Sequence, residues 1–76
     1  MPARRMENYI APLEKAKIPK SEISIIIRNL ERVEKAGASQ DQLGTVVTNV
    51  INLKGFKEKF LKDYKAAGTV VRNIKL

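Results

Sequence analysis

The spacing of aliphatic residues in the middle of the chain restricts its fold more than any other feature. Between residues 43 and 51 the apolar positions are Leu43, Val46, Val47, Val50 and Ile51. A half-buried strand would alternate apolar and polar residues, and the adjacent pairs in this segment break that alternation. The i, i+3, i+4, i+7, i+8 spacing therefore predicts an α-helix with one buried aliphatic face.

The pentapeptide VVTNV at residues 46–50 has two near copies, IIRNL at 26–30 and VVRNI at 70–74. One explanation is a structural repeat. The other is that three separate helices each bury a face that is rich in β-branched residues. The spacings and the flanking sequences of the copies differ, which favours the second explanation. The earlier copy lies in a similar stripe, formed by Ile23, Ile26, Ile27, Leu30 and Val33.

These patterns predict an all-α fold, a single domain of four short helices at roughly residues 4–17, 20–36, 40–53 and 56–75. Ser39 followed by Gln42 has the form of a capping box, and Gly37 is typical of a helix end. Either Ser21 or Pro19 opens the second helix. The last helix either continues through Gly68, which we prefer, or ends there and leaves an extended tail.

The composition excludes several classes of site. The 76 residues include no cysteine and no histidine. Disulfides, thiolate metal sites and the commonest general base are therefore absent. The pattern predicts a protein that is not an enzyme, with no cofactor, no metal and no small-molecule substrate. A chain this short has a small core, and pairing with another copy would add stability, so we expect a homo-oligomer.

The charge of the chain indicates what it binds. Fifteen Lys and Arg against eight Asp and Glu give a net charge of +7. Such an excess favours anionic partners, either nucleic acid or an acidic and apolar protein surface; a membrane surface ranks third. No apolar run approaches the roughly 20 residues of a membrane span. We therefore expect a cytoplasmic protein.

The junction of the two central predicted helices, at about residues 31–51, resembles a helix-turn-helix DNA-binding motif. The residues that match the motif are Gly37, Ala38, Ser39, Leu43 and Val46, with Ala36 buried before the turn. The resemblance implies that the second helix lies in a DNA major groove and contacts bases. Its implied base-contacting side chains are Gln40, Gln42, Thr45 and Asn49, with Asp41 on the same face.

No Lys or Arg occurs between Lys35 and Lys54, so phosphate contacts must come from other segments. The candidates are Arg4, Arg5, Lys54, Lys57, Lys62 and Lys65. They either bind phosphates flanking the neutral helix or form an ordinary solvated face with the carboxylates among them. The aromatic residues, including Phe56 and Phe60, are expected in the core.

A second candidate surface lies on the predicted helix at 20–36. Ile25 falls outside the apolar stripe of this helix, on the face with Arg28, Asn29 and Arg32. An isolated exposed isoleucine is ordinary, but these four residues could also form a protein interface. The function that follows is DNA binding by a small basic regulator, and the alternative is a helical protein-interaction module that assembles with itself or inhibits a larger protein.

Overall fold

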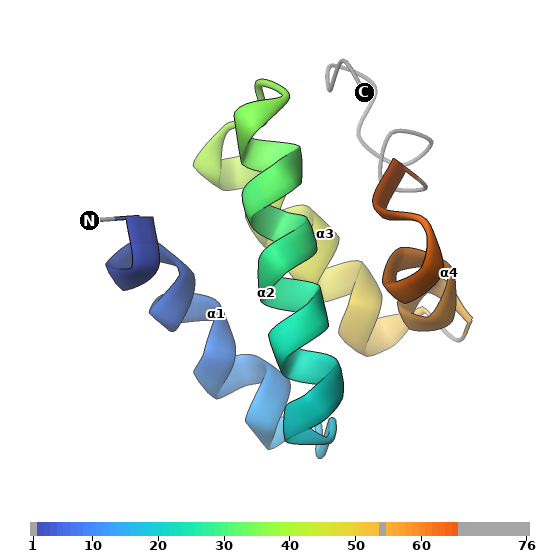
Figure 1. Ribbon diagram of the computed structural model, residues 1–76. Coiled ribbons are helices and arrows are strands. Elements are labelled where there is room, and N and C mark those ends of the chain that lie inside the picture. The colour runs from blue at the N-terminus through green and yellow to red at the C-terminus, as the bar shows by residue number, and fades with distance from the viewer. Residues whose placement is uncertain (1, 54, 66–76) are drawn as a thin grey trace.

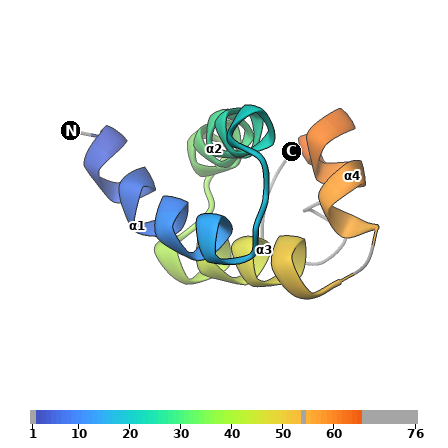
Figure 2. The ribbon, with the colours of Figure 1, turned by 90° about the horizontal axis from the view of Figure 1, so that it is seen from below.

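The computed structural model describes residues 2–53 and 55–65, and for residues 2–7 it describes the backbone alone. The described residues form four helices and no strand, which confirms the predicted all-α bundle. The helices are α1 (Pro2–Lys15), α2 (Lys20–Lys35), α3 (Gln40–Asn52) and α4 (Phe56–Lys62). In Figure 1, α2 lies between α1 and α4, and α3 runs obliquely behind it. Figure 2, seen from below, places α2 and α3 on opposite sides of the bundle.

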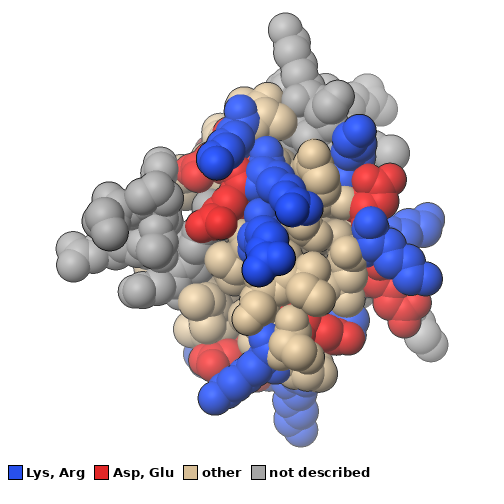
Figure 3. All heavy atoms as spheres, viewed as in Figure 1, with Lys and Arg blue, Asp and Glu red and all other residues tan. Residues whose placement is uncertain are grey.

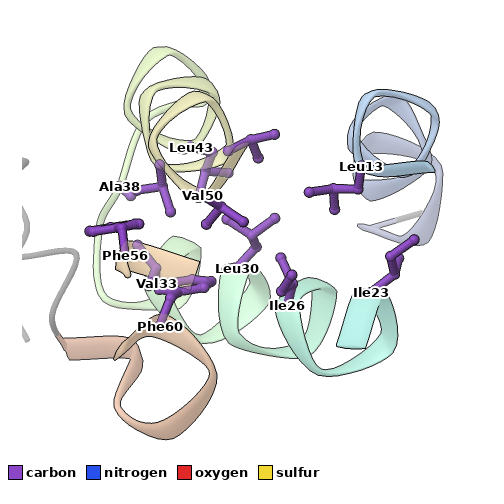
Figure 4. Close-up of a cluster of buried hydrophobic side chains, with 12 residues drawn as sticks. Leu13, Ile23, Ile26, Leu30, Val33, Ala38, Leu43, Val50, Phe56 and Phe60 are labelled. Atoms are coloured by element: carbon purple, nitrogen blue, oxygen red, sulfur yellow. The ribbon is translucent and has the colours of Figure 1, made fainter. Parts of the chain in front are cut away.

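The core forms where the four helices meet, and every helix contributes to it (Figure 4). Leu13 of α1, Leu30 of α2, Leu43 of α3 and Phe60 of α4 are fully buried. The predicted stripes are confirmed in α2 and α3, with two exceptions. Ile27 is only partly buried, and Ile51, expected in the core, is 36% exposed.

The two connections that precede α2 and α3 have the same pattern of backbone hydrogen bonds, and corresponding residues are twenty positions apart in the sequence. At the end of α1, the amide of Ile18 donates to Leu13 O and that of Lys17 to Glu14 O. At the end of α2, Ala38 N donates to Val33 O and Gly37 N to Glu34 O. Both patterns are Schellman motifs, which satisfy carbonyls that the helix end leaves unpaired. Their central residues have positive φ, 64° at Lys17 and 116° at Gly37.

The start of each central helix follows from its first residues. The predicted capping box is confirmed, because Gln42 N donates to Ser39 Oγ at 3.2 Å and Ser39 N donates to Gln42 Oε1 at 2.8 Å. The helix α2 instead follows Pro19, which has no side-chain bond to offer. Of the two openings considered for α2, the structure has the Pro19 turn.

The end of α4 differs from the prediction of a helix reaching residue 75. The helix ends at Lys62, and Asp63 has extended backbone angles of φ −146° and ψ 94°. The carboxylate of Asp63 accepts a hydrogen bond from Lys65 N at 3.0 Å. A local bond of this kind competes with helix continuation. The helix thus ends before Gly68, and the proposed tail at 68–76 lies outside the described residues.

Candidate nucleic-acid interface

Three of the four predicted base-contacting side chains already take part in hydrogen bonds within the protein. Gln40 Oε1 accepts from the Tyr9 hydroxyl at 3.2 Å, and Gln40 Nε2 donates to Glu34 Oε2 at 3.0 Å. Gln42 serves the capping box, and Thr45 Oγ1 donates to Asp41 O at 3.1 Å. Base contacts by these groups would require bonds inside the protein to break or to be shared.

The outward face of α3 also carries an unfavourable charge for DNA. Asn49 is half-buried, and the exposed residues Asp41, Thr45 and Thr48 include one carboxylate and no cation. Phosphate neutralisation supplies most of the affinity of a protein for nucleic acid. The helix that the sequence assigns to base contacts therefore lacks the groups that would hold it against a duplex.

Of the six predicted phosphate-contact residues, the structure describes the side chains of Lys57, Lys62 and Lys65. Lys57 Nζ lies 2.9 Å from Glu22 Oε1, in an ion pair that links α4 to α2. Lys62 is exposed at the end of α4, and Lys65 is exposed beyond it rather than on the same helix. The side chains of Arg4 and Arg5 and the whole of Lys54 lie outside the described residues.

A row of cations runs along the outer face of α2. Arg28, Arg32 and Lys35 are all exposed and follow the i, i+4, i+7 spacing of one helical face. We call these three residues the basic stripe. Figure 3 shows Lys and Arg side chains gathered over α2. Within the described part of the chain, none of the three is ion-paired with a carboxylate.

The stripe has carboxylates beside it, which lower its potential. Glu31 and Glu34 are half-buried on α2, and Glu34 Oε2 accepts from Gln40 Nε2. Lys59 and Lys62 on α4 are exposed, but so are Glu58 and Asp63. Since α2 carries four basic and three acidic residues and α4 three basic and one acidic, net charge does not distinguish α2. The row of three exposed cations, none of them ion-paired with a described carboxylate, is what distinguishes it.

Arg32 differs from the other two members of the stripe because its side chain is held in place. Its Nη1 donates to Asn29 Oδ1 at 3.3 Å, and its guanidinium carbon lies 5.6 Å from the centre of the Tyr64 ring. Such stacking of a cation on an aromatic face is favourable. Arg28 has no comparable contact among the described residues.

Asn29 corrects the sequence-based expectation, which placed it on the exposed face with Ile25. Its side chain is buried, with 4% of its surface exposed. Its Nδ2 donates to the backbone oxygen of Phe60 at 2.9 Å. A buried amide needs such partners, since an unpaired polar group costs free energy. Asn29 thus belongs to the contact between α2 and α4, whereas Ile25, at 42% exposed, lies on the surface as expected.

The basic stripe and the exposed face of α3 point in different directions. The helix α2 lies at the front of the molecule in Figure 1 and α3 at the back, and Figure 2 shows the same separation. The buried residues of α3, such as Val46 and Leu43, lie against the core, so its exposed side chains point away from α2. One straight duplex therefore cannot contact both faces at once.

Two residues of this region, Lys35 and Tyr64, were not among the candidate site residues predicted from the sequence. Lys35 completes the stripe, and its spacing from Arg28 and Arg32 is a signal that the sequence contains. The contact of Tyr64 with Arg32 has no such signal, because the two residues are joined only when α2 packs beside α4.

A second candidate surface is a groove of mixed polarity beside the end of α3, the start of α4 and the connection after α1. The groove has a volume of about 290 Å³ and is lined by Ala16, Ile18, Val50, Ile51, Leu53, Gly55, Lys57 and Glu58. Ile51 and Leu53 are 36% and 49% exposed. The groove carries one positive and one negative side chain, so its lining has no net charge.

Two kinds of feature are absent from the described residues. They contain no cluster of Asp and Glu arranged to hold a metal ion. None of the described helices has both the length and the apolar character needed to cross a membrane. Comparison of the chain with protein-family models, with curated proteins and with solved structures finds no match.

Proposed function

We propose that this protein binds nucleic acid through the phosphate backbone, with the basic stripe of α2 as the main contact surface. The observation that carries the proposal is the row of Arg28, Arg32 and Lys35, exposed and without ion pairs among the described residues. Seven residues of helix rise about 10 Å. That length matches about three nucleotide steps of a duplex, at about 3.4 Å each.

The overall charge supports the same proposal. A net charge of +7 attracts polyanions at long range, and the stripe gives that attraction a defined surface. The proposal keeps the predicted class of ligand but moves the contact from α3 to α2. Base contacts by Gln40, Gln42, Thr45 and Asn49 stay a prediction, which substitution of Thr45 and Asn49 would test through loss of sequence preference.

The test is the salt dependence of binding to a fluorescent duplex of random sequence, measured by anisotropy. The variant R28Q/K35Q removes two cations of the stripe, and the matched control K15Q/K20Q removes two exposed cations outside it. If each stripe residue neutralises one phosphate, the slope of log K against log salt becomes shallower by about 1.8 in the stripe variant. The control should keep the slope of the wild type.

Two results would contradict the proposal. Equal effects of both variants would mean that net charge, rather than the stripe, causes binding. A salt-independent affinity, or no binding by the wild type, would exclude phosphate contacts as the main interaction.

Self-assembly is a second candidate function, favoured by the exposed side chains of Ile51 and Leu53 in the lining of the groove beside the end of α3. The proposed occupant is a second copy of the chain. Two copies, each with a net charge of +7, repel each other least where they meet through a surface without net charge, such as this groove. Sedimentation of the wild type and of L53D, with I25D as a matched change elsewhere, tests it. A dimer that only L53D dissociates would support it, and a monomeric wild type would reject it.

A further inference from the structure

We infer that Arg32 is a pre-oriented phosphate-binding fork within the basic stripe, with Asn29 and Tyr64 as its positioning residues. The inference rests on the proposed function and assigns one residue of the stripe a distinct role. A guanidinium can bind a phosphate through two parallel N–H groups, and a lysine ammonium cannot. Such bidentate binding gains most when the side chain is held before the ligand arrives.

The orientation of Asn29 follows from its surroundings. Its amide nitrogen donates to Phe60 O at 2.9 Å, and only the nitrogen end of the amide can donate. The oxygen end is therefore directed elsewhere, and it accepts from Arg32 Nη1 at 3.3 Å. The hydrogen bond to the backbone of α4 thus fixes the orientation of the Asn29 amide, which turns its oxygen atom toward Arg32.

The ring of Tyr64 supplies the second restraint. The guanidinium carbon of Arg32 lies over the ring, 5.6 Å from its centre, so the ring attracts the cation and restricts where the side chain lies. One N–H group of Arg32 goes to Asn29, and no other hydrogen bond of its guanidinium is found within the described chain. The remaining N–H groups of this exposed side chain are available to a ligand.

Arg28 provides a matched comparison, because it lies one helical turn away on the same stripe and has neither restraint. Replacing either arginine by lysine keeps the charge and removes the fork. We expect R32K to bind a random duplex about 2- to 10-fold more weakly at every salt concentration, which corresponds to one lost hydrogen bond. R28K should stay within about twofold of the wild type, since its guanidinium is not pre-oriented.

The salt slope separates the fork from the charge. R32K should keep the wild-type slope because it retains the cation, whereas R32Q should reduce the slope by about 0.9.

The role of Tyr64 is tested in the same anisotropy assay. Y64L should weaken binding as R32K does without changing the slope, and Y64F, which keeps the ring, should bind like the wild type. If Tyr64 were purely structural, Y64L would lower the thermal transition temperature. Its loss of affinity would then not match that of R32K.

The inference and the proposed function fail in different ways. If R28Q/K35Q loses affinity while R32K behaves like R28K, the fork is rejected and the phosphate surface stands. If R28Q/K35Q binds like the wild type, the phosphate surface itself is rejected. Parallel titrations with duplex DNA and duplex RNA identify which backbone is bound. Binding only to vesicles containing phosphatidylserine, with no affinity for either duplex, would overturn both.

Discussion

The side-chain nitrogen of Asn29 lies 2.9 Å from the backbone oxygen of Phe60, in a buried hydrogen bond that joins α2 to α4. The last carbonyls of a helix have no partner within the helix, and Phe60 lies in the last turn of α4. Asn29 therefore completes the end of a helix far from it in sequence. A helix of seven residues is unstable alone, so α4 depends on such contacts and on the burial of its two phenylalanines.

The change N29A should destabilise the protein by about 1–3 kcal/mol, because it removes the donor for a buried carbonyl. Urea unfolding followed by circular dichroism measures the free energy of unfolding. N52A, at an exposed position at the end of α3, is the control and should change it by less than about 0.5 kcal/mol. Equal values for the two variants would show that the bond to Phe60 O contributes nothing.

Two glycines should respond to alanine with opposite signs. Gly37 has φ of 116°, which an alanine adopts only with strain, so G37A should lose about 1–2 kcal/mol. Gly44 lies inside α3, and an added Cβ would meet no atom within 4 Å. G44A should gain about 0.5–1 kcal/mol, because alanine favours helix and restricts the unfolded chain. The same sign for both in thermal unfolding would contradict this assignment.

Lys17 is the counterpart of Gly37 in the first connection and the only described non-glycine residue with positive φ. K17G should raise the free energy of unfolding by about 0.5–1 kcal/mol, since glycine adopts the left-handed region without strain. A11G, at an exposed position inside α1, is the control and should lower it by about 1 kcal/mol. A loss in both variants would mean that Lys17 is not strained.

The capping box of α3 should contribute measurably to stability. S39A removes the acceptor for Gln42 N and should cost about 1 kcal/mol. Q42A removes the reciprocal acceptor for Ser39 N. Because the two bonds form one structure, the double variant should lose less than the sum of the single losses. Additive losses in urea unfolding would show that the two bonds act independently, and T48A, at an exposed site of α3, controls for helix propensity.

The ion pair of Lys57 with Glu22 should contribute little and should weaken in salt. Its side chains are 31% and 32% exposed, so solvent screens much of the attraction. A double-mutant cycle of E22Q and K57M should give a coupling free energy of about 0.2–1 kcal/mol. The coupling should shrink in about 1 M NaCl, where the screening length falls to about 3 Å. A coupling that is independent of salt would indicate a pair shielded from water.

The buried faces of α2 and α3 could be predicted because the spacing of apolar residues within each helix is enough to identify them. The spacing of Leu43, Val46 and Val50 marks the buried side of α3 without reference to any other segment. The same holds for the capping box and for Gly37, whose roles depend on a few neighbouring residues. The candidate site was less predictable. Ile25 and two cations of the stripe were assigned to one exposed face, but Asn29, placed among them, is buried.

The sequence by itself determined that the chain is all-α, where α3 begins, and which faces of α2 and α3 are apolar, since each is set by interactions within about four residues. Only the tertiary structure decided that the Asn29 side chain donates to Phe60 O and that Arg32 lies over the ring of Tyr64. These contacts join residues about thirty positions apart. Their formation depends on how α2 packs beside α4, a relation that no local pattern encodes.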